Sequence, residues 1–160
     1  MNKKRICLAL AALFAGAASA GERIQITGNY GAMDKSQVLE LGPNHVLVLN
    51  SSEGTGYILN GPNADNPMQH AAGPCGGMVE LKEGKVVVGQ GYCVRTNSQG
   101  GKWLLKWAIP VGTDGSSGTW IISGLEGNTV GWKGEGTWGP VVSTGKDRYV
   151  NSFKGWLEKP

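Results

Sequence analysis

Apolar and polar residues alternate along many short segments of this chain, and glycine, asparagine, serine or proline interrupts the alternation between them. In residues 22–28, for example, Ile24 and Ile26 alternate with polar neighbours. A period of two is typical of β-strands that bury one face. Few windows after residue 20 place apolar residues at helical spacing. The pattern therefore predicts an all-β protein.

Nine segments fit this strand pattern. They are residues 22–28, 38–41, 45–50, 56–60, 85–96, 102–109, 118–124, 131–142 and 148–158. We expect one hairpin to join 45–50 to 56–60 across residues 51–54, and a stronger one to join 85–96 to 102–109. Because closure removes exposed strand edges, we predict a single antiparallel barrel of about eight strands, with a β-sandwich as the alternative.

The first twenty residues are organised like a signal peptide. A basic segment at residues 3–5 precedes an apolar run at residues 6–17 and the small residues Ala18-Ser19-Ala20. We therefore predict a signal peptide over residues 1–20 and export to the periplasm or out of the cell. The apolar run is too short to span a bilayer, and Cys7 lies at its start rather than at the cleavage point. No membrane anchor is expected.

The remaining chain, residues 21–160, has a length suited to one domain with a single core. Three of the 15 basic residues lie in the leader, which leaves 12 basic residues against 12 acidic ones. No cluster of lysine and arginine remains that would follow a phosphate backbone. Nucleic acid is therefore not an expected partner.

Two cysteines follow the leader, Cys75 and Cys93. An even number of cysteines in an oxidising compartment predicts a disulfide, which we expect to attach the long loop 61–77 to the strand 85–96. A reactive pair is the alternative. It is disfavoured because the cysteines lack C-x-x-C spacing and only His45 and His70 are available to activate a thiolate.

Gly134, Gly136 and Gly139 have the spacing G-x-G-x-x-G. A dinucleotide site needs a helix after these glycines, but Pro140 follows with no helical period. We interpret the segment as a strand whose glycines permit a bend or a close approach. No nucleotide, flavin or haem cofactor is expected. The two isolated histidines give no metal site, and no triad motif assigns a catalytic residue.

Small closed barrels are either filled by side chains or enclose one ligand. All six tryptophans lie on expected strands, where large aromatic residues fill a core or line a cavity. Arg95 and Glu135 would supply polar contacts, although strand alternation also allows both to face outward. The candidate ligand-binding residues are Tyr92, Trp107, Trp120, Trp138, Arg95 and Glu135.

Four elements in order resemble a known group of proteins. They are Gly-Gln-Gly-Tyr-Cys at 89–93, Gly118-Thr119-Trp120, the Gly-rich segment 131–138 and Lys154-Gly155-Trp156. This order is similar to that of small exported bacterial proteins with an allene-oxide-cyclase-like barrel, a fold shared with plant dirigent proteins. Those relatives often carry Gly-Thr-Gly-Lys where this chain has Gly124-Leu125-Glu126-Gly127.

The resemblance covers residues 85–158 and implies a barrel of the calycin-like or allene-oxide-cyclase-like kind. It places no catalytic residue of the plant enzymes on this chain. Three functions stay open: binding of a small apolar or amphipathic ligand, a barrel enzyme of cyclase or isomerase type, and a protein- or glycan-interaction module. A hollow barrel with an inward ionisable group favours the enzyme, and a purely apolar cavity favours binding.

Overall fold

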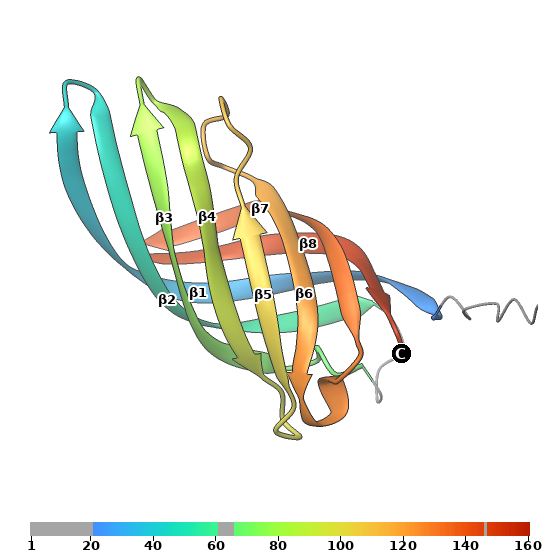
Figure 1. Cartoon of the computed structure of the whole chain (residues 1–160). Helices are drawn as coiled ribbons and strands as arrows, with labels where there is room; N and C mark the ends of the chain where they lie inside the picture. The colour runs from blue at the N-terminus through green and yellow to red at the C-terminus, as the bar shows by residue number, and fades with distance from the viewer. Residues whose placement is uncertain (1–20, 61–65, 146) are drawn as a thin grey trace, which may run out of the picture.

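The computed structural model describes residues 21–60, 66–145 and 147–160, and the predicted signal peptide lies outside these residues. The chain forms a closed antiparallel barrel of eight strands, in which each strand pairs with the next and β8 pairs with β1 (Figure 1). The strands are β1 (Arg23–Gly42), β2 (His45–Asn60), β3 (Ala71–Lys82), β4 (Lys85–Thr96), β5 (Lys102–Ala108), β6 (Gly118–Glu126), β7 (Lys133–Gly145) and β8 (Arg148–Glu158), with a short 3-10 helix η1 (Gly127–Thr129) after β6. The predicted all-β barrel is confirmed, and the sandwich alternative is wrong.

The N-terminal strands are longer than the sequence pattern predicts. Residues 22–28 and 38–41 belong to one strand, β1, and the expected hairpin across residues 51–54 does not exist. Ser51 and Ser52 instead pair with Gly76 and Cys75 in the middle of the β2–β3 ladder. This run of turn-forming residue types is therefore part of β2 and not a turn.

The β1–β2 turn lies between the expected strands 38–41 and 45–50. It follows Gly42 and places Asn44 in the left-handed region, with φ 52°, a conformation that asparagine adopts more readily than most residues. The expected loop 61–77 is also shorter, because β3 starts at Ala71. Residues 61–65 of that loop lie outside the described residues.

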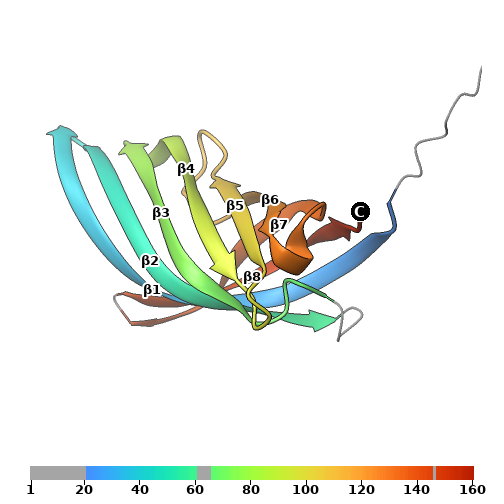
Figure 2. The same cartoon turned by 60° about the horizontal axis from the view of Figure 1, so that its bottom comes forward.

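The barrel is closed along only part of its length. β1 pairs with β8 through residues 23–33 and with β2 through residues 27–42, while the β6–β7 ladder ends at Gly118 and Trp138. Beyond these points the β1–β2 and β3–β4 hairpins extend past the rest of the barrel, as Figures 1 and 2 show. One end of the barrel is therefore an open, curved wall.

The opposite end is filled by a compact core. Its buried members come from β1, β5, β6, β8 and the segment before β7: Ile26, Trp103, Trp120, Ile122, Trp132 and Leu157. The Pro67 carbonyl closes this end by accepting hydrogen bonds from Asn97 Nδ2 at 2.9 Å and from Trp103 Nε1 at 3.2 Å. The interior is thus solid at one end.

The Gly-rich motif belongs to the barrel wall. The first two of its glycines, Gly134 and Gly136, lie in β7 and face inward. The indole of Trp120 lies flat against Gly136 and Gly155, where an added Cβ would come within 2.5 and 2.6 Å of the ring. Close approach of the Trp120 ring and of the Lys154 carbonyl therefore explains Gly136, and close approach of the Trp156 carbonyl and Leu157 explains Gly134.

Candidate functional site

A cavity of about 500 Å³ occupies the open half of the barrel. Every strand contributes to its lining, and the walls are mainly apolar. The larger apolar residues that line it are Val48, Val79, Leu81, Leu105, Trp107, Ile109, Trp120, Trp138 and Phe153. A volume of this size is within the range of small-molecule sites in proteins.

Small inward residues leave this volume unfilled. In the wall made by β2 and β3, the inward positions include Asn50, Ser52, Gly77 and Val79. Trp107 does not project into the centre, because its ring lies against Gly77 and Gly91. Because these glycines have no side chains, the Trp107 ring lies close to the wall and the centre of the open half stays empty. Gly136 and Gly155 accommodate the ring of Trp120 in the same way at the base of the cavity.

A carboxyl group and two hydroxyl groups meet on the cavity wall. Asp34 on β1 lies opposite Ser52 on β2, and its carboxylate accepts hydrogen bonds from the hydroxyls of Tyr149 and Ser52. Burial raises the pKa of Asp34, and the nearby carboxylate of Asp147 adds to this effect, while the two hydrogen bonds oppose it.

Tyr149 also holds its proton more firmly than a tyrosine in water. Burial is the main cause that raises its pKa, and interactions with Tyr30 and Asp34 raise it further. The Tyr149 hydroxyl therefore stays protonated across the physiological pH range and continues to donate its hydrogen bond to Asp34. Together, Asp34, Ser52 and Tyr149 form a polar patch in a mainly apolar cavity.

Two further polar atoms of the lining have no partner. Asn50 Oδ1 on β2 and Trp138 Nε1 on β7 are buried, and neither forms a hydrogen bond with any described residue. Leaving a buried polar group unpaired costs about 1–3 kcal/mol. The side chains of Asn50 and Trp138 line the cavity, but these two atoms are themselves covered by protein, so the cavity does not expose them.

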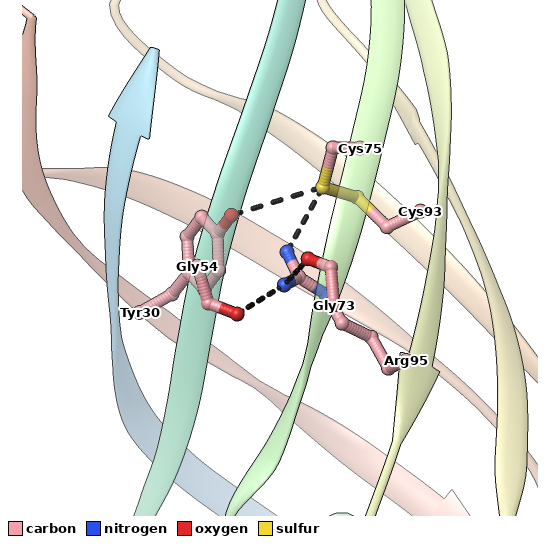
Figure 3. The surroundings of a disulfide bond; sticks show 6 residues. All are labelled: Tyr30, Gly54, Gly73, Cys75, Cys93 and Arg95. Atoms are coloured by element: carbon pink, nitrogen blue, oxygen red, sulfur yellow. Dashed lines mark hydrogen bonds between the residues drawn. A yellow bond between two sulfur atoms is a disulfide. The ribbon is translucent and has the colours of Figure 1, made fainter.

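A buried arginine lies beside the disulfide at the inner part of the cavity (Figure 3). Arg95 is 7% exposed, its Nη1 donates to the carbonyls of Gly54 and Gly73, and its guanidinium lies 4.4 Å from the centre of the Tyr30 ring. The β3–β4 pairing is interrupted at Gly73 and at Pro74, which has no N–H to donate. Arg95 on β4 thus connects β2 and β3 by side-chain hydrogen bonds where the β3–β4 backbone pairing is interrupted.

The predicted disulfide between Cys75 and Cys93 is present, with Cα atoms 3.9 Å apart. Its position differs from the expectation, because Cys75 lies within β3 and directly opposite Cys93 on β4. The bond therefore links two neighbouring strands rather than a loop and a strand. Both cysteines line the cavity.

The candidate ligand residues divide between the two faces of the wall. Trp107, Trp120, Trp138 and Arg95 line the cavity, whereas Tyr92 is 54% exposed and has the ammonium of Lys106 5.9 Å from its ring. Glu135 is exposed as well.

Strand alternation explains why Tyr92 and Glu135 face outward. Tyr92 lies between the inward glycine at position 91 and Cys93, and Glu135 lies between the inward Gly134 and Gly136. Of the two orientations that alternation allowed for Glu135, the structure has the outward one, and neither Tyr92 nor Glu135 lines the cavity.

Several polar residues of the site were not expected from the sequence, among them Asp34, Asn50, Ser52 and Tyr149. The alternation of inward and outward positions along β1 could have identified Asp34. If β1 is continued in steps of two from the buried Ile26, the inward face reaches Tyr30, Ala32 and Asp34. That extension requires one unbroken strand, which the glycine-interrupted pattern did not suggest.

Among the described residues, no group of three or more histidine, cysteine, aspartate or glutamate side chains is placed to hold a metal ion. His45, one of the two histidines, pairs with Glu80 through an Nε2–Oε1 distance of 2.7 Å. No helix in the described part of the chain combines the length and apolar character that a membrane crossing requires.

The sequence matches no protein-family model and no curated protein.

Proposed function

We propose that this protein binds one small, largely apolar molecule in the open half of its barrel. The observation that carries the proposal is the mainly apolar cavity of about 500 Å³, whose lining includes the polar patch of Asp34, Ser52 and Tyr149. Ligand sites combine apolar walls with a few polar groups that fix orientation. Both features occur together here, in the same cavity.

The cavity lining also indicates which chemical groups the ligand contains. Its body is apolar and packs between the indoles and the aliphatic side chains. A rotation of the Asn50 or Trp138 side chain toward the cavity would let a ligand hydroxyl or amine donate to Asn50 Oδ1, or a ligand oxygen accept from Trp138 Nε1. The Asp34, Ser52 and Tyr149 patch offers further hydrogen bonds. An amphipathic ligand therefore fits better than a pure hydrocarbon.

The proposal includes action outside the cytoplasm, in the periplasm or as a secreted protein. The N-terminal leader pattern supports export, and the Cys75–Cys93 disulfide is compatible with an oxidising compartment. In this setting a binding protein would carry or sequester a poorly soluble molecule.

Filling the cavity should weaken binding strongly. Val48 lines the cavity, and its neighbour Leu49 faces outward and is 38% exposed. Titration with the uncharged fluorescent probe N-phenyl-1-naphthylamine should show one site per chain in the wild type. Val48→Trp should weaken binding at least tenfold, because the indole occupies the space of the probe, while Leu49→Trp should bind like the wild type. Equal binding by both variants would place the probe outside the barrel.

A proton-transferring enzyme, such as an isomerase, is the second candidate. It meets the condition given above for an enzyme, a hollow barrel with an inward ionisable group: the carboxyl of Asp34 and the hydroxyl of Tyr149 both face the cavity, and burial raises the pKa of each. Nuclear magnetic resonance in heavy water separates the candidates. An enzyme of this kind would exchange the C–H protons next to the carbonyl of a bound ketone, and a binding protein would not.

A further inference from the structure

The two sulfur atoms of the disulfide lie in different electrostatic surroundings. Arg95 Nη2 lies 2.9 Å from Cys75 Sγ, and the hydroxyl oxygen of Tyr30 lies 3.7 Å from the same sulfur (Figure 3). Within the described part of the chain, no comparable polar contact reaches Cys93 Sγ. The disulfide is therefore polarised toward Cys75.

The charge of Arg95 strengthens this asymmetry. The side chain is buried, and no carboxylate among the described residues forms an ion pair with it. A disulfide sulfur is a weak acceptor, so the guanidinium has no strong acceptor at Nη2. A thiolate at Cys75 would be such an acceptor. A cation beside a thiol lowers its pKa, and a thiol of lower pKa leaves more readily in thiol–disulfide exchange.

The cavity gives a route to the bond. Both Cys75 and Cys93 line it, although Cys93 is only 4% exposed. A small thiol that enters the open end therefore meets the disulfide from inside the barrel. This route requires the cavity but not the proposed ligand.

We propose that the Cys75–Cys93 disulfide is a directional exchange site for small thiols, with Cys93 as the attacked sulfur and Cys75 as the leaving group. The thiol gives its proton to water, and its thiolate forms a bond to Cys93 Sγ. The Cys75–Cys93 bond breaks, and its electron pair goes to Cys75 Sγ, where the thiolate pairs with Arg95. One disulfide is consumed and one mixed disulfide is formed. Attack of Cys75 on Cys93 reverses the reaction and releases the thiol.

The position of the adduct tests the direction. The purified protein is treated with 2-mercaptoethanol, quenched with N-ethylmaleimide and digested with trypsin, which places Cys93 in peptide 86–95 and Cys75 in peptide 36–82. Mass spectrometry should find the mercaptoethanol adduct on Cys93 at least ten times as often as on Cys75. An equal distribution, an excess on Cys75, or no adduct before global unfolding would overturn the proposal.

Single-cysteine variants test the cause without altering Arg95. In Cys93→Ser the remaining Cys75 should react with iodoacetamide at a pH about one unit below that required by Cys93 in Cys75→Ser. Arg95→Gln in the Cys93→Ser background should remove the difference, and Arg23→Gln, which alters an exposed arginine far from the cavity, should leave it unchanged. If the Arg95→Gln variant does not fold, the pH profiles of Cys93→Ser and Cys75→Ser still show whether Cys75 reacts at a lower pH than Cys93. Identical pH profiles would show that the guanidinium does not activate Cys75.

Discussion

Replacing Trp120 by alanine should lower the free energy of unfolding by about 3–5 kcal/mol, the range found when a buried large aromatic residue is truncated. Trp120 is 4% exposed, its Nε1 donates to the Thr137 carbonyl at 3.1 Å, and its ring meets Phe153 edge to face. Truncation would leave a void at the boundary between the solid and hollow halves. Urea denaturation followed by circular dichroism measures the loss.

Tyr92 provides the matched control for Trp120. It is also an aromatic residue on a barrel strand, but it is 54% exposed on the outer face. Tyr92→Ala should therefore change the free energy of unfolding by no more than about 0.5 kcal/mol, as is usual for surface positions. A Tyr92→Ala variant as unstable as Trp120→Ala would contradict the assignment of the two faces.

Replacing Gly136 by alanine should destabilise the barrel by about 3 kcal/mol, at the upper end of what overpacking usually costs. An added Cβ would overlap the carbonyl oxygen of Lys154 on β8 and lie 2.5 Å from the ring of Trp120. A backbone oxygen cannot move aside as a flexible side chain can. The strands or the indole must shift, which the same urea denaturation would report.

Gly31 should respond in the opposite direction. It also lies within a strand, β1, but an added Cβ there meets no atom within 4 Å. Gly31→Ala should therefore raise the free energy of unfolding by about 0.5 kcal/mol, because alanine restricts the unfolded chain more than glycine does. A loss of stability in both variants would mean that glycine is needed for strand curvature and not for the contact with Trp120.

The sequence was informative where the alternation was regular. The hairpin of 85–96 with 102–109 and the strand 148–158 follow a clear period of two, and both are found in the structure. The pattern failed at residues 51–54, because Ser and Gly favour turns locally. Their pairing with β3 depends on contacts that only the closed barrel supplies.

The candidate site was harder to predict than the fold. Alternation gives the relative orientation of residues in a strand but does not say which face is inside. On β4 an aromatic residue, Tyr92, faces water, while a charged one, Arg95, faces the interior and joins neighbouring strands. Asp34 and Tyr149 lie far apart in the sequence and meet only because β8 closes on β1. No local sequence pattern predicts this contact between two strands that are distant in the sequence.

A crystal structure of the protein grown with 4-iodophenol tests the ligand cavity most directly. This probe has an apolar ring, one hydroxyl group and an iodine atom that anomalous scattering locates. We predict the iodine inside the cavity, with the hydroxyl oxygen within hydrogen-bonding distance of the patch of Asp34, Ser52 and Tyr149. Iodine found only on the outer surface, or a cavity filled by the protein's own side chains, would contradict the proposal that this barrel binds a small molecule.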